Sequence, residues 1–245
     1  SMSRPLENRI AVVTGASRGL GRAMSLALAS AGAHIVATAR TQGGLEELDD
    51  EIKAIGGSAT LVPCDIKDFD ALDRLGAAIF ERWKKLDIFV GNAGTLGKLT
   101  PLPHLDPKVW DDAMAINVTA NYRLIRSLDP LLRAADAGRV VLVTSGLAHK
   151  CWPYWGPYSI SKAALEAMAK VYAGETATTA VRVNCFSPGP TRTKMRATAM
   201  PGEDPEMLPS AEEVAAQMVA MCTPAFTDTG TVWKYASTGL FKQFG

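Results

Sequence analysis

The sequence of 245 residues is poor in the residues that build metal sites and disulfide frameworks. Its four cysteines form no CxxC pair, and its three histidines stand at no metal-ligand spacing from them or from each other. Cys64 and Cys185 stand in apolar runs and are expected to be small buried hydrophobic residues. The sequence therefore predicts neither a metal site nor structural disulfides.

The sequence also lacks an excess of charge of either sign and a long apolar run. Lysine and arginine number 26 against 25 for aspartate and glutamate, and their mixing favours neither nucleic acid nor an anionic membrane as the main partner. No stretch reaches the ~20 apolar residues of a membrane span, and no secretory signal is recognisable. The opening Ser1-Met2 looks like a remnant of tag removal. A cytoplasmic protein is expected, with no nucleic acid and no membrane among its partners.

What the sequence does contain is an alternation of short apolar runs with helical patterns. The runs are typical of strands at about 9–14, 34–39, 59–63, 86–91, 138–144 and 180–186, with a seventh candidate at 231–235. This alternation predicts an α/β fold of three layers, a doubly wound, mostly parallel sheet of about seven strands with helices on both faces. No repeat or linker divides residues 1–245, so one domain is expected. Prolines and glycines interrupt residues 188–209, which are expected to form a mobile lid.

A glycine-rich turn, Thr14 to Gly21, follows the first strand and precedes a helix rich in alanine and leucine. Small residues let the backbone approach a pyrophosphate, and the start of the helix offers free N–H groups. The glycine spacing differs from GxGxxG, and no Lys-Ser or Lys-Thr follows as in a Walker loop. The pattern predicts a dinucleotide site, with a purely structural turn as the alternative.

The end of the second strand indicates which dinucleotide is bound. An acidic residue there would bind the 2'-hydroxyl of NAD, but this chain has Arg40, joined by Arg18 in the glycine turn. Two guanidinium groups suit a 2'-phosphate, so NADP(H) is preferred and NAD(H) stays open. The alternative is that both arginines are ordinary surface charges. Asp65, after the third strand, is expected either to accept a hydrogen bond from adenine or to form a turn or cap.

Tyr158 and Lys162 lie four residues apart in an expected helix, so one turn places an ammonium beside a phenol. A neighbouring positive charge would lower the pKa of Tyr158 toward the range of a working acid-base group. The pair alone also fits a half-buried tyrosine beside a solvated lysine. Ser145, at the end of the fifth strand, and Asn117 further upstream strengthen the catalytic interpretation.

At this point the chain resembles the short-chain dehydrogenase/reductase family, in its single-domain branch, across nearly its whole length. The resemblance rests on the TGxxxGxG turn at Thr14 to Gly21, Asn92-Ala93-Gly94, Asn117, Ser145, Tyr158 with Lys162, and Pro188-Gly189 followed by Thr193. It implies a Rossmann domain that binds NAD(P) over residues 1–245. Two departures are the missing Asp-Gly-Gly turn before the last strand and Thr191, where valine or isoleucine is frequent.

The resemblance also implies a role for each matching residue. Tyr158 would be the general acid/base, and Lys162 would lower its pKa and bind the nicotinamide ribose. Ser145 would orient the substrate oxygen, and Asn117 would hold a water that links Lys162 to solvent. The implied cofactor site comprises Gly15, Ser17, Arg18, Gly19, Leu20, Gly21, Arg40, Asp65, Ile66, Asn92, Ala93, Gly94, Tyr158, Lys162, Pro188, Gly189, Thr191 and Thr193.

The implied reaction is hydride transfer between NADPH and a carbonyl, or its reverse from a secondary alcohol. Residues 146–157 are rich in aromatic side chains, which favours an apolar or aromatic substrate, or else packing against the lid or another subunit. For His149 in this loop, contact with the substrate is the alternative and a surface role is expected. Alternatives are a catalytically inactive NADP-binding regulator, an NAD-preferring alcohol dehydrogenase and an epimerase-like enzyme. By analogy a homodimer or homotetramer is expected. The substrate-lining candidates are Leu96, Leu147, Trp152, Trp155 and Met195.

Overall fold

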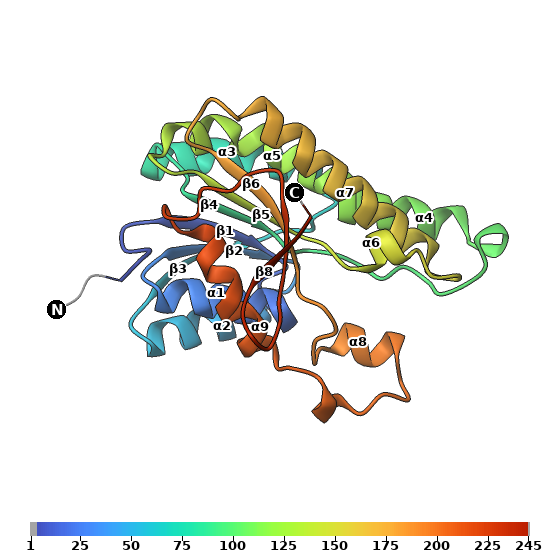
Figure 1. Cartoon of the computed structure of the whole chain (residues 1–245). Helices are drawn as coiled ribbons and strands as arrows, with labels where there is room; N and C mark the ends of the chain where they lie inside the picture. Colours follow the sequence, from blue (N-terminus) through green and yellow to red (C-terminus); the bar gives the residue numbers. More distant parts are fainter. Residues whose placement is uncertain (1–3, 245) are drawn as a thin grey trace.

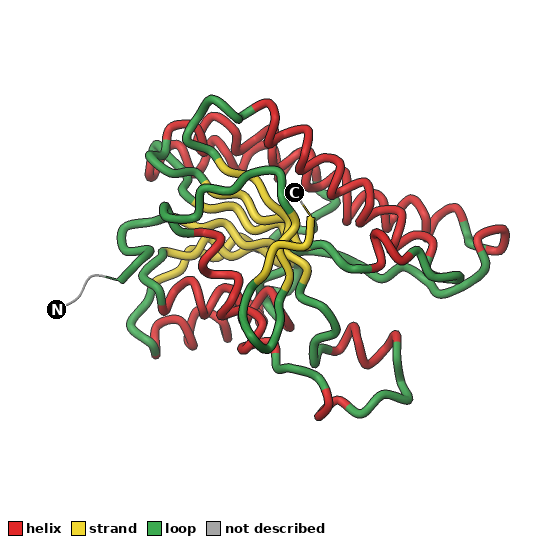
Figure 2. Tube along the Cα trace, viewed as in Figure 1, coloured by secondary structure: helices red, strands yellow, loops and turns green. Residues whose placement is uncertain are grey.

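The computed structural model describes residues 4–244 and contains one eight-stranded sheet in the order β3-β2-β1-β4-β5-β6-β7-β8 (Figures 1 and 2). The first seven strands pair in parallel, and β8 runs antiparallel to β7. The strands are β1 Ile10–Thr14, β2 His34–Ala39, β3 Ser58–Pro63, β4 Ile88–Gly91, β5 Arg139–Val143, β6 Arg182–Ser187, β7 Val232–Lys234 and β8 Phe241–Phe244. Strand order reverses between β1 and β4, so the predicted doubly wound fold is confirmed.

Helices cover both faces of this sheet (Figure 1). One face carries α1 Gly19–Ser30, α2 Gln42–Ala54 and α9 Ala211–Met218. The other carries α3 Phe69–Trp83, α5 Ala120–Ala134 and α7 Gly156–Glu175. Shorter elements project from the carboxyl ends of the strands: η1 Leu102–His104, α4 Pro107–Met114, η2 Ala115–Thr119, α6 Leu147–Lys150, α8 Lys194–Ala199 and η3 Pro205–Met207. A further short helix, η4 Val219–Cys222, continues α9 toward the amino end of β5, where Arg139 donates to the Thr223 and Pro224 carbonyls.

The central strands are buried on both faces, which explains their unbroken apolar sequences. Every residue of β1, β4 and β5 is buried. Successive residues serve opposite faces: Val13 packs in the core beneath α1 and α2, whereas Val12 packs in the core beneath α3, α5 and α7. The strands therefore form a rigid support that holds the loops at their carboxyl ends.

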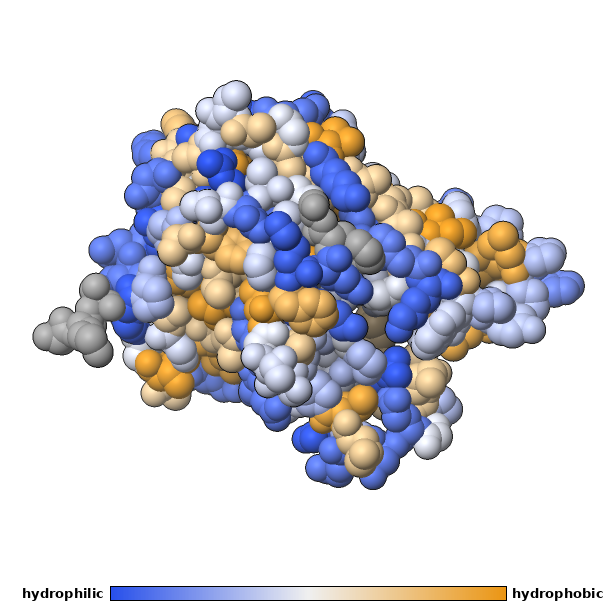
Figure 3. Space-filling model, in the orientation of Figure 1, coloured by the Kyte–Doolittle hydropathy of each residue, from blue (hydrophilic) through white to orange (hydrophobic). Residues whose placement is uncertain are grey.

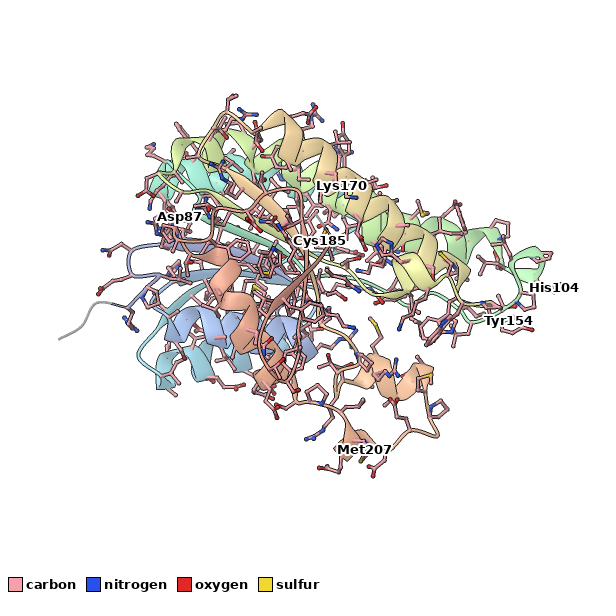
Figure 4. All side chains as sticks on the ribbon, in the orientation of Figure 1. Asp87, His104, Tyr154, Lys170, Cys185 and Met207 are labelled. Carbon is pink, nitrogen blue, oxygen red and sulfur yellow. The ribbon has the colours of Figure 1, made fainter. Side chains whose placement is uncertain are left out.

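The amino ends of the strands are joined by a buried ion cluster centred on Asp87. The Asp87 carboxylate is fully buried and accepts hydrogen bonds from the Ile10 backbone N–H at 2.8 Å and from Lys85 Nζ at 2.8 Å. Arg9 Nη1 lies 3.2 Å from Asp87 and also contacts the exposed Asp136. Figure 4 shows Asp87 at the opposite end of the molecule from Tyr154, so this cluster belongs to the structural end of the sheet.

The seven strands expected from the sequence are present, but β8 was not expected. Its four residues, Phe-Lys-Gln-Phe, form a short segment with a polar centre, and they lack the apolar run on which the other strands were recognised. The strand β8 forms by antiparallel pairing with β7, and the register of this pair is interrupted between Val232 and Trp233. Within residues 4–244, no helix is both long enough and apolar enough to span a bilayer.

Candidate active site

The glycine turn leads from the end of β1 into α1 and leaves the start of that helix uncapped by any side chain of the described chain. Gly15 and Gly19 have φ angles of +60° and +57°, a region that residues with a β-carbon seldom adopt. Arg18, the N-cap residue, is extended and its side chain is exposed. Ser17 and Leu20 are half-buried beside it. The turn thus presents backbone N–H groups and a helix N-terminus, an arrangement suited to phosphate.

Thr14 joins this turn to the segment that follows β4. Its hydroxyl oxygen accepts hydrogen bonds from the backbone N–H groups of Asn92 and Ala93, both at 2.9 Å. Asn92 Nδ2 donates in return to the Thr14 carbonyl at 3.2 Å. Thr14 was not among the predicted site residues, although its place as the first residue of the TGxxxGxG pattern could have indicated this role. The glycine turn and the segment Asn92-Ala93-Gly94, both implied to bind the cofactor, are therefore held together.

The two predicted phosphate-binding arginines lie at the ends of neighbouring elements and are both exposed. Arg18 stands at the start of α1, and Arg40 directly follows β2, which pairs with β1. Asp65 Oδ1 accepts a hydrogen bond from the Lys67 backbone N–H at 2.9 Å, the turn-forming role weighed for it, while Ile66 is half-buried. Exposed guanidinium groups beside a phosphate-binding turn fit a dinucleotide with a 2'-phosphate.

Asn117 is buried in a π-helical turn, η2, between α4 and α5. Its Oδ1 accepts from the Thr95 N–H at 2.8 Å, and its Nδ2 donates to the Thr95 carbonyl at 3.0 Å and to Ser161 Oγ at 2.9 Å. Its backbone carbonyl accepts from Asn121 Nδ2 at 3.0 Å. The side chain therefore joins the segment after β4 to α7. Both Nδ2 protons are used in this way, so a water could be bound only through the acceptor oxygens, the Oδ1 and the backbone carbonyl.

Tyr158, Ser145 and Lys162 come together where β5 ends and α7 begins. Lys162 is buried, and its Nζ donates to the Val143 carbonyl at 2.9 Å and lies 5.7 Å from the centre of the Tyr158 ring. The Ser145 hydroxyl interacts with Tyr158 and also accepts from the Leu147 N–H at 3.2 Å. Three of the four residues predicted to be catalytic are thus brought together at the carboxyl edge of the sheet.

The electrostatics of this cluster correct one sequence expectation. Burial raises the pKa of Tyr158, and this outweighs the lowering effects of the Ser145 hydroxyl and of the positive charge on Arg196 in α8. The expected lowering of the Tyr158 pKa by Lys162 is not found. Burial also lowers the pKa of Lys162 to about 8, against opposing effects of Cys185 and Glu166. The phenol therefore holds its proton firmly, while the lysine titrates much closer to neutrality than usual.

Residues 188–209, the expected lid, leave the end of β6 and contain α8 and η3. Gly189 follows Pro188, and its carbonyl accepts from Thr191 Oγ1 at 2.9 Å; Thr193 caps α8 by accepting from the Arg196 N–H at 3.2 Å. Arg196 forms a two-point ion pair with Glu203 at 2.8 and 2.9 Å. The segment therefore has internal bracing while projecting from the sheet (Figure 1).

A row of aromatic rings leads from the surface to Tyr158. The ring centres of Trp152 and Trp155 are 6.1 Å apart, and those of Trp155 and Tyr158 are also 6.1 Å apart. Trp152 is 42% exposed, and Tyr154 at the tip of the loop is 60% exposed (Figure 4). Of the other predicted lining residues, Leu96 is half-buried and Met195 is exposed, but Leu147 is buried, with 7% of its surface exposed. The space-filling view shows apolar side chains on the lid lobe as well (Figure 3).

One group beside this cluster was missed at the sequence level. Glu166, one helical turn beyond Lys162 on α7, is buried and bound by two partners. Thr144 Oγ1 donates to Glu166 Oε2 at 2.6 Å, and His149 Nε2 lies 2.7 Å from Glu166 Oε1. The sequence carried a signal for it, because this glutamate interrupts the otherwise apolar stretch from Ala163 to Ala169. His149, for which a surface role was expected, thus contacts a buried carboxylate.

Comparison with known proteins agrees with this geometry. The family profile described as short chain dehydrogenase matches residues 9–204. The uncharacterized oxidoreductase YciK of Escherichia coli (strain K12) is 36% identical over 215 residues, covering 85% of this chain and 84% of that protein. A short chain dehydrogenase from Shigella flexneri 2a, solved in complex with NADP, has 33% identity and a TM-score of 0.91 over 95% of this chain and 99% of that one. Another from Escherichia coli CFT073, solved with NADPH, has 33% identity and a TM-score of 0.89 over 96% and 99%.

Proposed function

The chain belongs to the short-chain dehydrogenase family, and from that premise we propose that it is an NADPH-dependent oxidoreductase acting on a carbonyl or secondary alcohol. The observation that carries the proposal is the meeting of the Tyr158 and Ser145 hydroxyls with the buried Lys162 at the carboxyl end of β5. This places an acid-base group, a hydroxyl donor and a positive charge at the edge of the sheet where ligands of such folds bind.

In the proposed reaction Tyr158 donates its proton to the carbonyl oxygen, and Ser145 orients that oxygen by hydrogen bonding. The raised pKa of Tyr158 suits this direction, because the phenol holds its proton until the oxygen acquires charge. The bound cofactor supplies the hydride. Lys162 places a positive charge beneath the phenol ring, and the Asn117 carbonyl accepts a water of the proton relay.

We assign the preference for NADP(H) to Arg18 and Arg40, which stand exposed at the start of α1 and the end of β2. Both can approach a 2'-phosphate with paired N–H donors, and no acidic residue stands at the position after β2 to bind a free 2'-hydroxyl. The Shigella and Escherichia coli structures similar to this chain were solved with NADP and NADPH, which supports the same choice.

The substrate class proposed is an apolar or aromatic carbonyl compound. Trp152 and Trp155 form a continuous aromatic surface that ends at Tyr158, and Met195 of α8 is exposed on the lid segment. Such side chains bind flat apolar groups by area burial and ring stacking. The remaining predictions are a single domain over residues 1–245 with residues 188–209 as its lid, assembly into a homodimer or homotetramer, and a cytoplasmic location.

The test compares the wild type with Tyr158→Phe. Turnover of ketones, aldehydes, quinones and 3-oxoacyl thioesters is monitored through the oxidation of NADPH and of NADH. We expect the wild type to reduce at least one class with NADPH, and Tyr158→Phe to lose at least ~10²-fold in kcat while still binding NADPH. Tyr154→Phe is the matched control, because it removes the same atom from an exposed tyrosine of the neighbouring loop. Near-normal turnover by Tyr158→Phe would overturn the role of that residue. Wild-type protein that binds NADPH but turns over nothing would favour the inactive regulator.

A further inference from the structure

Glu166 is a buried carboxylate beside the proposed site that the proposed chemistry does not use. Its side chain is only 7% exposed, and both of its oxygens are engaged, one by Thr144 at 2.6 Å and the other by His149 at 2.7 Å. A buried carboxylate is costly unless it is hydrogen-bonded and faces a positive charge. The two hydrogen bonds satisfy the carboxylate oxygens. The positive charge must come from the groups that surround Glu166.

The partners of Glu166 come from the elements that carry the proposed active site. Thr144 directly precedes Ser145, and the carbonyl before it, that of Val143, accepts from Lys162 Nζ at 2.9 Å. His149 lies in α6, the helix that begins two residues after Ser145. Glu166 itself lies one turn after Lys162 on the same side of α7. One carboxylate therefore links β5, α6 and α7 at the point where they present Ser145, Tyr158 and Lys162.

Titratable groups on three elements lie around this carboxylate. Lys162 is the buried cation on its own helix, and His149 approaches from α6. Cys185 of β6 interacts electrostatically with Glu166, with Lys162 and with Lys170, which lies one turn further along α7 (Figure 4 labels Cys185 and Lys170). Burial raises the pKa of the Cys185 thiol, so the thiol is neutral at ordinary pH. The negative charge that faces the Lys162 ammonium is therefore that of Glu166.

We propose that Glu166 is a positioning residue for this site: held by Thr144 and His149, its carboxylate keeps the buried ammonium of Lys162 charged and holds the Ser145 segment against α7. The role of Lys162 in turnover rests on the proposed function, but its electrostatic coupling to Glu166 does not. Burial lowers the pKa of Lys162 to about 8, and Glu166 is among the groups that oppose a further fall.

The coupling is tested by NMR titration of Lys162 in the free protein, with ¹³C,¹⁵N-labelled lysine and the signal assigned by its absence from Lys162→Met. In Glu166→Gln the carboxylate charge is lost while the side-chain shape and an acceptor for Thr144 remain. We expect the Lys162 midpoint to fall by about 1 pH unit in this variant, the size of shift that a nearby opposite charge produces. In Glu166→Asp, which keeps the negative charge, the Lys162 midpoint should stay close to the wild-type value. Glu175→Gln, on an exposed glutamate of the same helix, should leave the midpoint unchanged.

A Lys162 midpoint that is the same in Glu166→Gln and wild type would overturn the proposal. If Glu166→Gln does not fold, the double variant Lys162→Met/Glu166→Gln decides, because it leaves no unpaired charge buried. If the double variant folds while Glu166→Gln does not, the coupling is supported. If neither variant folds, Glu166 acts independently of Lys162, and the proposal is overturned. Where turnover is found, the alkaline limb of the pH–rate profile should move to lower pH in Glu166→Gln, with the KM for substrate little changed. The titration can be measured even if no substrate is turned over. The coupling of Glu166 to Lys162 can therefore be contradicted independently of the proposed oxidoreductase function.

Discussion

Gly21 packs so closely against the Gly15 carbonyl that a β-carbon at residue 21 would overlap the carbonyl oxygen. The contact brings the first turn of α1 against the end of β1 and sets the shape of the phosphate-binding turn. The glycine at 21 is thus required by space, whereas those at 15 and 19 are required by backbone angle.

Gly21→Ala is expected to lower both stability and dinucleotide affinity, because either the Gly15 carbonyl or α1 must move. Overpacking of this kind costs about 1–3 kcal/mol, measured by urea unfolding, and NADPH binding can be followed by fluorescence. Gly174→Ala is the matched control: a β-carbon there meets nothing within 4 Å, so the change should leave stability equal or raise it by ~1 kcal/mol. Equal stability and affinity of Gly21→Ala and wild type would contradict the packing described here.

Arg40→Asp is expected to reverse the cofactor preference. The variant loses a guanidinium that can bind a 2'-phosphate and gains a carboxylate that repels it, so affinity for NADPH should fall ~10- to 100-fold while affinity for NADH is kept or improved. Dissociation constants for both dinucleotides provide the measurement. Arg126→Asp, at an exposed arginine of α5, is the control for net charge. An unchanged ratio in Arg40→Asp would remove the basis for assigning the phosphorylated cofactor.

The rate of carbonyl reduction is expected to fall as pH rises through about 8. Burial lowers the pKa of Lys162 to about 8, so the ammonium is present below this pH and lost above it, while the raised pKa of Tyr158 keeps the phenol proton available throughout. The pH dependence of kcat/KM for reduction is the measurement, and a flat profile across this range would contradict it. Stability should change in the opposite sense: unfolded lysine keeps its proton to ~10.5, so the contribution of Lys162 to stability rises with pH between the two values.

Asp87→Asn is expected to destabilise the protein by about 2–4 kcal/mol, because Arg9 and Lys85 lose the buried charge that they share. Turnover of the remaining folded protein should be normal, since Asp87 lies at the amino ends of the strands (Figure 4). Asp136→Asn is the control: that carboxylate contacts the same arginine but is 76% exposed, and its loss should change stability little. Urea unfolding of the two variants separates the buried from the exposed carboxylate.

The parallel sheet could be predicted from the sequence because its strands are buried on both faces and therefore carry continuous apolar runs. The expected strand at 34–39 coincides with β2, and the one at 138–144 contains β5. β8 was missed because its four residues have no apolar run and take their conformation from pairing with β7. Pairing between distant segments leaves little trace in a short stretch of sequence.

The candidate site was predicted where a motif fixes both residue type and position, as at Tyr158 and Lys162. What local spacing could not supply was the protein environment. The direction of the Tyr158 pKa depends on burial by the surrounding fold, and the contact of His149 with Glu166 depends on the meeting of α6 and α7. The π-helical turn at Asn117 was likewise invisible, because its residues fit an ordinary helix equally well.

That π-helical turn gives the segment an unusual sensitivity to length. From Pro107 to Ala134 the backbone is helical throughout, with η2 between α4 and α5. A π turn holds more residues than an α turn, so deleting one residue here would convert it to regular winding at no loss of helix. Because the wide turn already accommodates the extra residue, α4 and α5 would keep their facing directions, and only the side chains within the turn would be displaced. Asn117 lies inside that turn and would no longer meet both Thr95 and Ser161, so a one-residue deletion here should preserve the helices but break the link between the segment after β4 and α7.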